Sequence, residues 1–187
     1  MNTQRKPGWV TFVAVVGIVL SGFGALGGVQ EAMSPLMFEQ QQQQYDQMIK
    51  EFGTITDELE RYNDPANQGI INFMKWFVNA FEKILNMPEW YKTWMVISGI
   101  LAMAINGFYM FGAIALMQLK PQAIRYLFIA LPLSISLGAV RTYFAYSAFD
   151  DTGLLFMSGT MAAIVIEIIL LLILIKADKA PYRQFEA

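Results

Sequence analysis

One carboxylate has an environment in which an acid is unusual. Glu167 follows Val165 and Ile166 and precedes Ile168 and Ile169, within a long apolar run. An ionisable group inside a membrane span is costly and is a functional candidate by default. Three roles remain open: a structural hydrogen bond to another helix or chain, handling of an ion or proton, and contact with a lipid head group, a quinone or a partner. We favour the structural role.

Other polar residues are expected at a similar depth. At 1.5 Å per residue, Asn106 lies ~18 Å and Glu167 ~20 Å into their spans, so a hydrogen bond across the bundle is geometrically allowed. Pro132 is expected to kink the third span, and Ser134 and Ser136 could satisfy the carbonyl groups that the kink frees. Such a set can line a small cavity, and it also occurs in purely structural bundles.

The sequence excludes much of enzymology. It contains no cysteine and no histidine, which removes thiolate chemistry, the commonest metal ligand and the commonest general base. We find no phosphate loop and no nucleophile elbow. The net charge of −2 gives no sign of a basic stripe for nucleic acid. We therefore expect no enzyme, no metal site, no cofactor and no nucleic-acid partner.

The elements that must position these residues are membrane helices. Hydrophobic residues make up 56% of the chain and charged residues 15%, whereas soluble domains are about a quarter charged. Four runs approach the ~20 apolar residues that a span needs, at about 9–29, 93–117, 121–146 and 154–175. The first could be a signal peptide, but its apolar run exceeds the usual ~7–15 residues, and a retained anchor is expected.

Basic residues predict the orientation. Cytoplasmic segments carry the excess of Lys and Arg, and three segments of this chain are basic. The segment between the first two spans is acid-rich. We expect both termini in the cytoplasm and residues 34–92 outside it, in a cell membrane, with the bacterial inner membrane as the favoured one. The basic residues are Arg5, Lys6, Lys120, Arg125, Lys176, Lys179 and Arg183.

The segment between the first two spans is predicted to be a helical hairpin. Residues 38–62 carry apolar side chains at heptad spacing, the cluster at 63–67 is typical of a turn, and residues 70–85 form an amphipathic stripe. This second helix has more apolar surface than one short partner covers, so part of it would face the membrane interface or another subunit. The aromatic residues concerned are Phe73, Trp76, Phe77 and Phe81.

The fold class is therefore all-α, an integral membrane four-helix bundle with a two-helix hairpin between its first and second helices. The expected divisions are 1–33, the hairpin at 34–92, and the later spans with their links at 93–118, 119–147 and 148–187. Near the outer edge, Arg141 is expected to form a topology-fixing ion pair with Asp150 and Asp151.

Small residues on the first span are expected to permit close helix packing. Gly17, Ser21, Gly24 and Gly28 lie along nearly one face, and small residues four apart let helix backbones approach closely. Packing inside the bundle is the favoured interpretation, and dimerisation through this face is the alternative.

Two short stretches resemble known sequences. The opening run Lys6-Pro7-Gly8-Trp9-Val10-Thr11, followed by a glycine-rich span, and the link Leu119-Lys120-Pro121-Gln122-Ala123-Ile124-Arg125 resemble small uncharacterised bacterial membrane proteins with four transmembrane helices. The resemblance implies the same membrane topology. It carries over no functional residue, and the long acidic hairpin departs from the compact forms of that pattern.

Two functions are left for such a chain. The first, which we favour, is a non-enzymatic scaffold or accessory subunit of a membrane complex or homo-oligomer that recognises partners through the outer hairpin. The alternative is a small channel or an ion- or proton-coupled transport component that uses Glu167 and Asn106. Membrane lipids, other membrane subunits or further copies of the chain are the expected partners.

Overall fold

The computed structural model describes residues 7–62 and 65–177, and every regular element in them is helical. Four of the described helices are long and apolar enough to cross a membrane, which indicates a multi-pass membrane protein. Asn63, Asp64, Arg5, Lys6, Lys179 and Arg183 lie outside the described residues. The helices are α1 (Gly8–Arg61), η1 (Pro65–Asn67), α2 (Gln68–Leu85), α3 (Glu89–Met117), α4 (Ala123–Phe149), α5 (Asp151–Phe156) and α6 (Ser158–Lys176).

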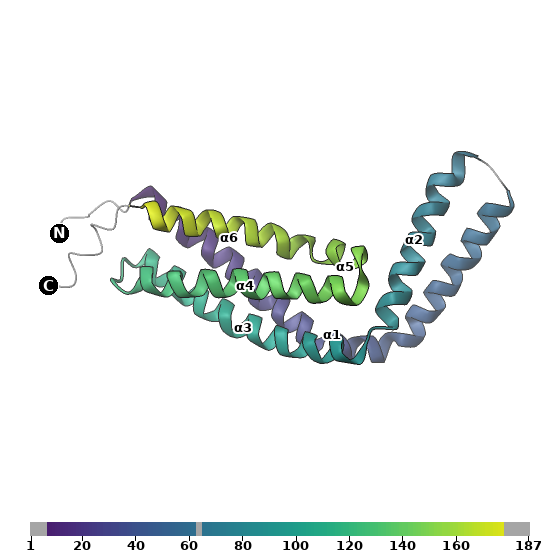
Figure 1. Cartoon of the computed structure of the whole chain (residues 1–187), viewed down its shortest axis with the longest axis horizontal. Helices are drawn as coiled ribbons and strands as arrows, with labels where there is room; N and C mark the ends of the chain where they lie inside the picture. The colour runs from purple at the N-terminus through teal and green to yellow at the C-terminus, as the bar shows by residue number, and fades with distance from the viewer. Residues whose placement is uncertain (1–6, 63–64, 178–187) are drawn as a thin grey trace.

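The four long helices form an incompletely closed bundle. Helix α1 packs along α3, α3 along α4, and α4 along α6, whereas α6 and α1 touch at few places. Helix α1 begins and α6 ends at the same end of the bundle, and the hairpin leaves from the opposite end (Figure 1). The bundle is therefore most open along the seam between α1 and α6.

The first span and the first helix of the hairpin are one element. Helix α1 runs for 54 residues through Pro35, so the expected division at residue 33 is not a helix end. A proline removes one backbone hydrogen bond and its ring crowds the preceding turn, which bends a helix without necessarily ending it. Ser34 Oγ donates to the Gln30 carbonyl at 2.7 Å beside this point. Figure 1 shows α1 bending where the hairpin leaves the bundle.

The hairpin is held together by aromatic contacts between α2 and the outer half of α1, the part that follows Pro35. The ring centroids of Phe52 and Phe77 are 5.2 Å apart, and those of Tyr45 and Phe81 are 6.2 Å apart. The expected heptad pattern on α1 is only partly used, because Thr56 is buried whereas its neighbour Ile55 is exposed. The two helices therefore pack through aromatic rings rather than along one regular heptad seam.

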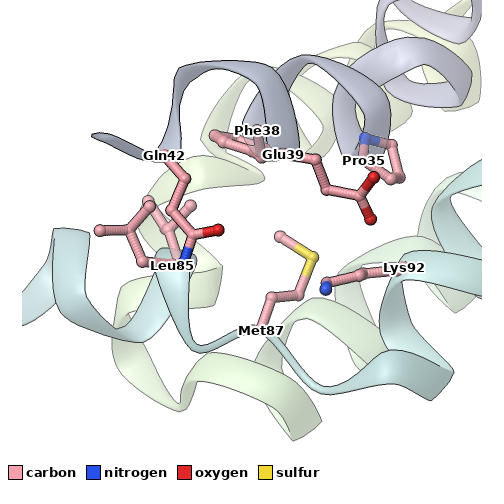
Figure 2. Close-up of a pocket in the computed structure, with 8 residues that line it drawn as sticks. Pro35, Phe38, Glu39, Gln42, Leu85, Met87 and Lys92 are labelled. Atoms are coloured by element: carbon pink, nitrogen blue, oxygen red, sulfur yellow. The ribbon is translucent and has the colours of Figure 1, made fainter. Parts of the chain in front are cut away.

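The base of the hairpin lies against the bundle at a small crevice. Phe38, Glu39 and Gln42 of α1 face Leu85 and Met87 across about 30 Å³ of open space (Figure 2). Met87 is buried and packs with Phe38. The link between α2 and α3, residues 86–88, is short, which places the hairpin close to the bundle end.

The fourth span is shorter than expected. Sequence patterning places it at about 154–175, but the structure breaks this region into α5 and α6. Met157 separates the two helices and caps neither with its side chain. Asp150, before α5, has a φ of 55°, a left-handed conformation that lets the chain reverse sharply after α4.

Candidate functional site

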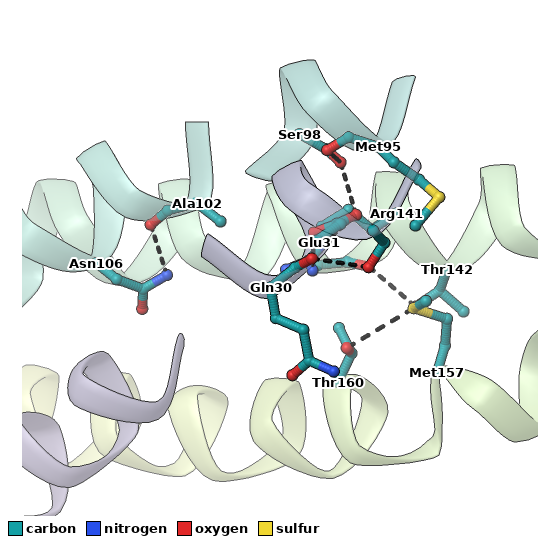
Figure 3. A network of polar contacts seen from close by, with 12 residues as sticks. Gln30, Glu31, Met95, Ser98, Ala102, Asn106, Arg141, Thr142, Met157 and Thr160 are labelled. Atoms are coloured by element: carbon teal, nitrogen blue, oxygen red, sulfur yellow. Dashed lines mark hydrogen bonds and ion pairs between the residues drawn. The ribbon is translucent and has the colours of Figure 1, made fainter. Parts of the chain in front are cut away.

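A largely buried ion pair joins α1 to α4. Arg141 donates to both carboxylate oxygens of Glu31, from Nε to Oε1 at 3.3 Å and from Nη2 to Oε2. Ser98 of α3 donates to Glu31 Oε1 at 2.7 Å. The side chains of Arg141 and Glu31 are only 17% and 10% exposed. Figure 3 shows these residues converging from three helices.

The partner predicted for Arg141 is wrong. Asp150 pairs instead with Lys83 of α2, with 3.3 Å between Nζ and Oδ2, and Asp151 opens α5 at an exposed position. Because α4 is helical to Phe149, Asp150 lies ~13 Å along the axis from Arg141 at the helical rise. That separation is too long for a direct ion pair.

Sequence analysis assigned Glu31 no role in the bundle. The signal was present, because the residues from Ala32 to Phe38 are apolar except for Ser34, so the apolar stretch of α1 continues past Glu31. An acid at this position and a base near the same edge of another span can neutralise each other. Their pairing offsets part of the cost of burying each charge.

The intramembrane carboxylate is held by a serine. Ser134 Oγ of α4 donates to Glu167 Oε1 of α6 at 2.7 Å. The expected Asn106–Glu167 hydrogen bond is not among the contacts found in the described residues. Asn106 Nδ2 donates instead to the Ala102 carbonyl of its own helix at 2.8 Å. The Asn106 side chain packs directly against Gly24 of α1, where an added Cβ would lie 2.6 Å from Asn106 Cγ.

These polar side chains do share one cavity. Its volume is about 610 Å³, and its polar lining includes Gln30, Asn106, Ser134, Arg141, Thr160 and Glu167. It lies along the open seam between α1 and α6. The cavity that sequence analysis raised as one interpretation is therefore present, although Asn106 and Glu167 line it without bonding to each other.

A second cavity meets the first at the ion pair. It has a volume of about 310 Å³, lies under the hairpin base, and is lined largely by apolar residues such as Phe38, Met87 and Tyr91. Gly27, Gln30, Arg141 and Phe156 line both cavities. The Arg141–Glu31 pair thus stands between the hairpin side of the bundle and the polar residues at its centre.

Two further predicted residues lie apart from this site. Ser136 is exposed, because two residues along a helix turn it about 200° away from Ser134. Helix α4 continues through Pro132 without interruption. Of the two serines, only Ser134 therefore faces the cavity.

The small residues of α1 face α3. A Cβ at Gly28 would lie 2.7 Å from the Gly99 carbonyl oxygen, and one at Gly17 would lie 3.1 Å from Ala113 Cβ. Ser21 is fully buried and donates to the Gly17 carbonyl at 2.7 Å. This face is therefore occupied within the chain.

The aromatic residues predicted as an interaction surface fall into two groups. Phe77 and Phe81 are engaged with α1, as described above. Phe73 and Trp76 are exposed, at 62% and 42%, and their rings lie 6.0 Å apart. Only the second pair is available to a partner or a membrane.

Among residues 7–62 and 65–177, no group of three or more acidic side chains is placed to hold a metal ion. Comparison of the chain with protein-family models, with curated proteins and with solved structures finds no match.

Proposed function

We propose that this protein is a non-enzymatic scaffold or accessory subunit of a membrane complex or homo-oligomer, with the hairpin as its recognition element. The observation that carries this proposal is the continuity of α1, which runs without a break from the bundle to the hairpin tip. A helical arm continuous with a span has few ways to move independently of it. Such an arm suits the presentation of a surface at a defined place.

Two ion pairs further support a fixed hairpin. Arg141–Glu31 ties α1 to α4 just below the bend, and Lys83–Asp150 ties α2 to the end of α4. The hairpin also carries an exposed acidic surface on α1, which includes Glu51, Asp57 and Glu58. That surface is suited to a partner with complementary basic charge.

The proposed location is a cell membrane, with the bacterial inner membrane favoured. The excess of Lys and Arg in the segments other than the hairpin supports a cytoplasmic location for both termini and an outer location for the hairpin. Labelling of single introduced cysteines with an impermeant reagent on intact cells tests this orientation, since the chain has no cysteine of its own. A label at Asp57→Cys and none at Lys120→Cys is expected.

The scaffold role is tested by the size and composition of the native particle. The protein is extracted from its own membrane in a mild detergent, and the particle mass is measured by light scattering. The expected result is a particle larger than one chain that shrinks on Asp57→Lys with Glu58→Lys. The matched control is Lys120→Glu at the opposite end of the bundle. A monomer of unchanged mass in all variants contradicts the proposal.

The alternative is a small channel or an ion- or proton-coupled transport component. The specific support is the cavity of about 610 Å³ that Glu167, Ser134 and Asn106 line. In liposomes, this role requires ion or proton flux above that of protein-free vesicles. The flux should fall on Glu167→Gln and persist in Glu82→Gln, which alters an exposed carboxylate of the hairpin. Flux equal to background, or equal in both variants, excludes it.

A further inference from the structure

One ion pair shows which side of α2 is turned toward the bundle. Lys83 of α2 lies 3.3 Å from Asp150, which follows the last residue of α4 at the hairpin end of the bundle. The face of α2 that carries Lys83 is therefore turned toward that end. Lys75, which pairs with Glu60 of α1, lies about 80° from Lys83 around the helix, so adjacent sides of α2 contact the bundle end and α1.

The exposed aromatic residues lie on the bundle side of α2. Trp76 precedes Lys83 by seven residues, which is close to two helical turns, so the two side chains leave the helix in nearly the same direction. Phe73 lies about 60° further around the helix from Trp76, with its ring 6.0 Å from that of Trp76. Both side chains are exposed, although Trp76 lies on the side that faces the rest of the molecule.

The hairpin leans across the end of the bundle instead of continuing its axis. Figure 1 shows α2 on the bundle side of the hairpin and the outer half of α1 beyond it. The bundle end itself carries exposed aromatic residues, namely Trp90, Tyr143 and Tyr146. Aromatic side chains gather at the level of the lipid head groups, so this belt marks the membrane surface beside which α2 emerges.

We propose that α2 is an interfacial helix that inserts Phe73 and Trp76 into the head-group region of the leaflet on the hairpin side. An amphipathic helix with aromatic residues on one face binds there by burying that face at the boundary with the acyl chains. The phospholipid surface is the occupant because it surrounds the bundle at the level where Lys83 meets Asp150. The acidic surface of α1 then remains in water. This inference requires no protein partner and goes beyond the scaffold role.

Spin labels on single cysteines test the proposal in the full-length protein. The protein is placed in nanodiscs of phosphatidylcholine and phosphatidylglycerol, and each label is probed with oxygen and with a water-soluble nickel chelate. Asn79→Cys reports on α2 while both aromatic residues stay in place, and Asp57→Cys reports on α1. The expected ratio of oxygen to nickel accessibility is several-fold higher at residue 79 than at residue 57.

Dependence on the aromatic pair is the second readout. In the Asn79→Cys background, Phe73→Ser with Trp76→Ser should lower the ratio to that of residue 57. Ile55→Ser with Tyr62→Ser, which removes exposed apolar side chains of α1, should leave it unchanged. Equal ratios at residues 79 and 57 would mean that α2 stands in water. Low accessibility to both probes at residue 79 would mean that a second copy or another protein covers it. Either result overturns the proposal.

Discussion

Arg141 and Glu31 lie 110 positions apart in the chain, and they form a bidentate ion pair in the bundle. Ser98 supplies a further hydrogen bond to the same carboxylate. One polar interaction thus connects α1, α3 and α4 immediately before α1 bends into the hairpin.

Removing one member of this pair should be strongly destabilising. Arg141→Met or Glu31→Gln leaves its partner largely buried without its counter-ion, a loss of about 3–5 kcal/mol. The double variant Arg141→Met with Glu31→Leu should recover most of that loss. Reversible unfolding by dodecyl sulfate in mixed micelles measures each value. Lys92→Met, at the exposed Lys92–Glu89 pair, is the control and should cost at most about 1 kcal/mol. Single variants as stable as the control would show that the pair contributes little.

The crossing of α1 and α3 should depend on Gly28. A Cβ there meets the Gly99 carbonyl at 2.7 Å and the Met103 nitrogen at 3.0 Å, whereas a Cβ at the adjacent Gly27 meets nothing within 4 Å. Gly28→Val should therefore force the two helices apart and lose about 1–3 kcal/mol from overpacking. Gly27→Val should lose much less in the same unfolding assay. Equal losses would indicate a general intolerance of valine in this part of α1.

The bend of α1 should depend on Pro35. Pro35→Ala restores an N–H that can donate to the Glu31 carbonyl and removes the ring that crowds it. We expect α1 to straighten and the hairpin to move away from the bundle end. Spin labels at Asn79→Cys and Ser147→Cys measure this as a longer distance by pulsed electron resonance. Gln40→Ala, an exposed site on α1, should leave the distance unchanged. An unchanged distance in Pro35→Ala would show that tertiary contacts alone hold the bend.

The two serines of α4 should behave differently. Ser134→Ala deletes the hydrogen bond to Glu167 and should cost about 1 kcal/mol in the unfolding assay, since such contacts in membranes are modest. Ser136→Ala, on the opposite and exposed side of the helix, should be neutral. An equal loss of stability in Ser136→Ala would contradict a specific hydrogen bond from Ser134 to Glu167.

Local sequence patterns were sufficient to predict the helices but not the contacts between them. Apolar run length predicted four spans, because a span must expose apolar side chains along its whole length. The continuity of α1 was not predicted, because a proline can end a helix or only bend it, and the surrounding contacts decide between the two.

The sequence by itself determined that the chain is helical, that four of its helices can cross a membrane, and that the segment between the first two can pair as a hairpin. These are one-dimensional properties, set by hydropathy, helical period and turn residues. Tertiary structure alone decided that Arg141 meets Glu31 instead of Asp150, that Asn106 bonds to its own helix, and that Trp76 faces the bundle end. Each of these outcomes depends on how helices rotate and cross, because a polar side chain in an apolar medium takes whichever partner the packing brings within reach.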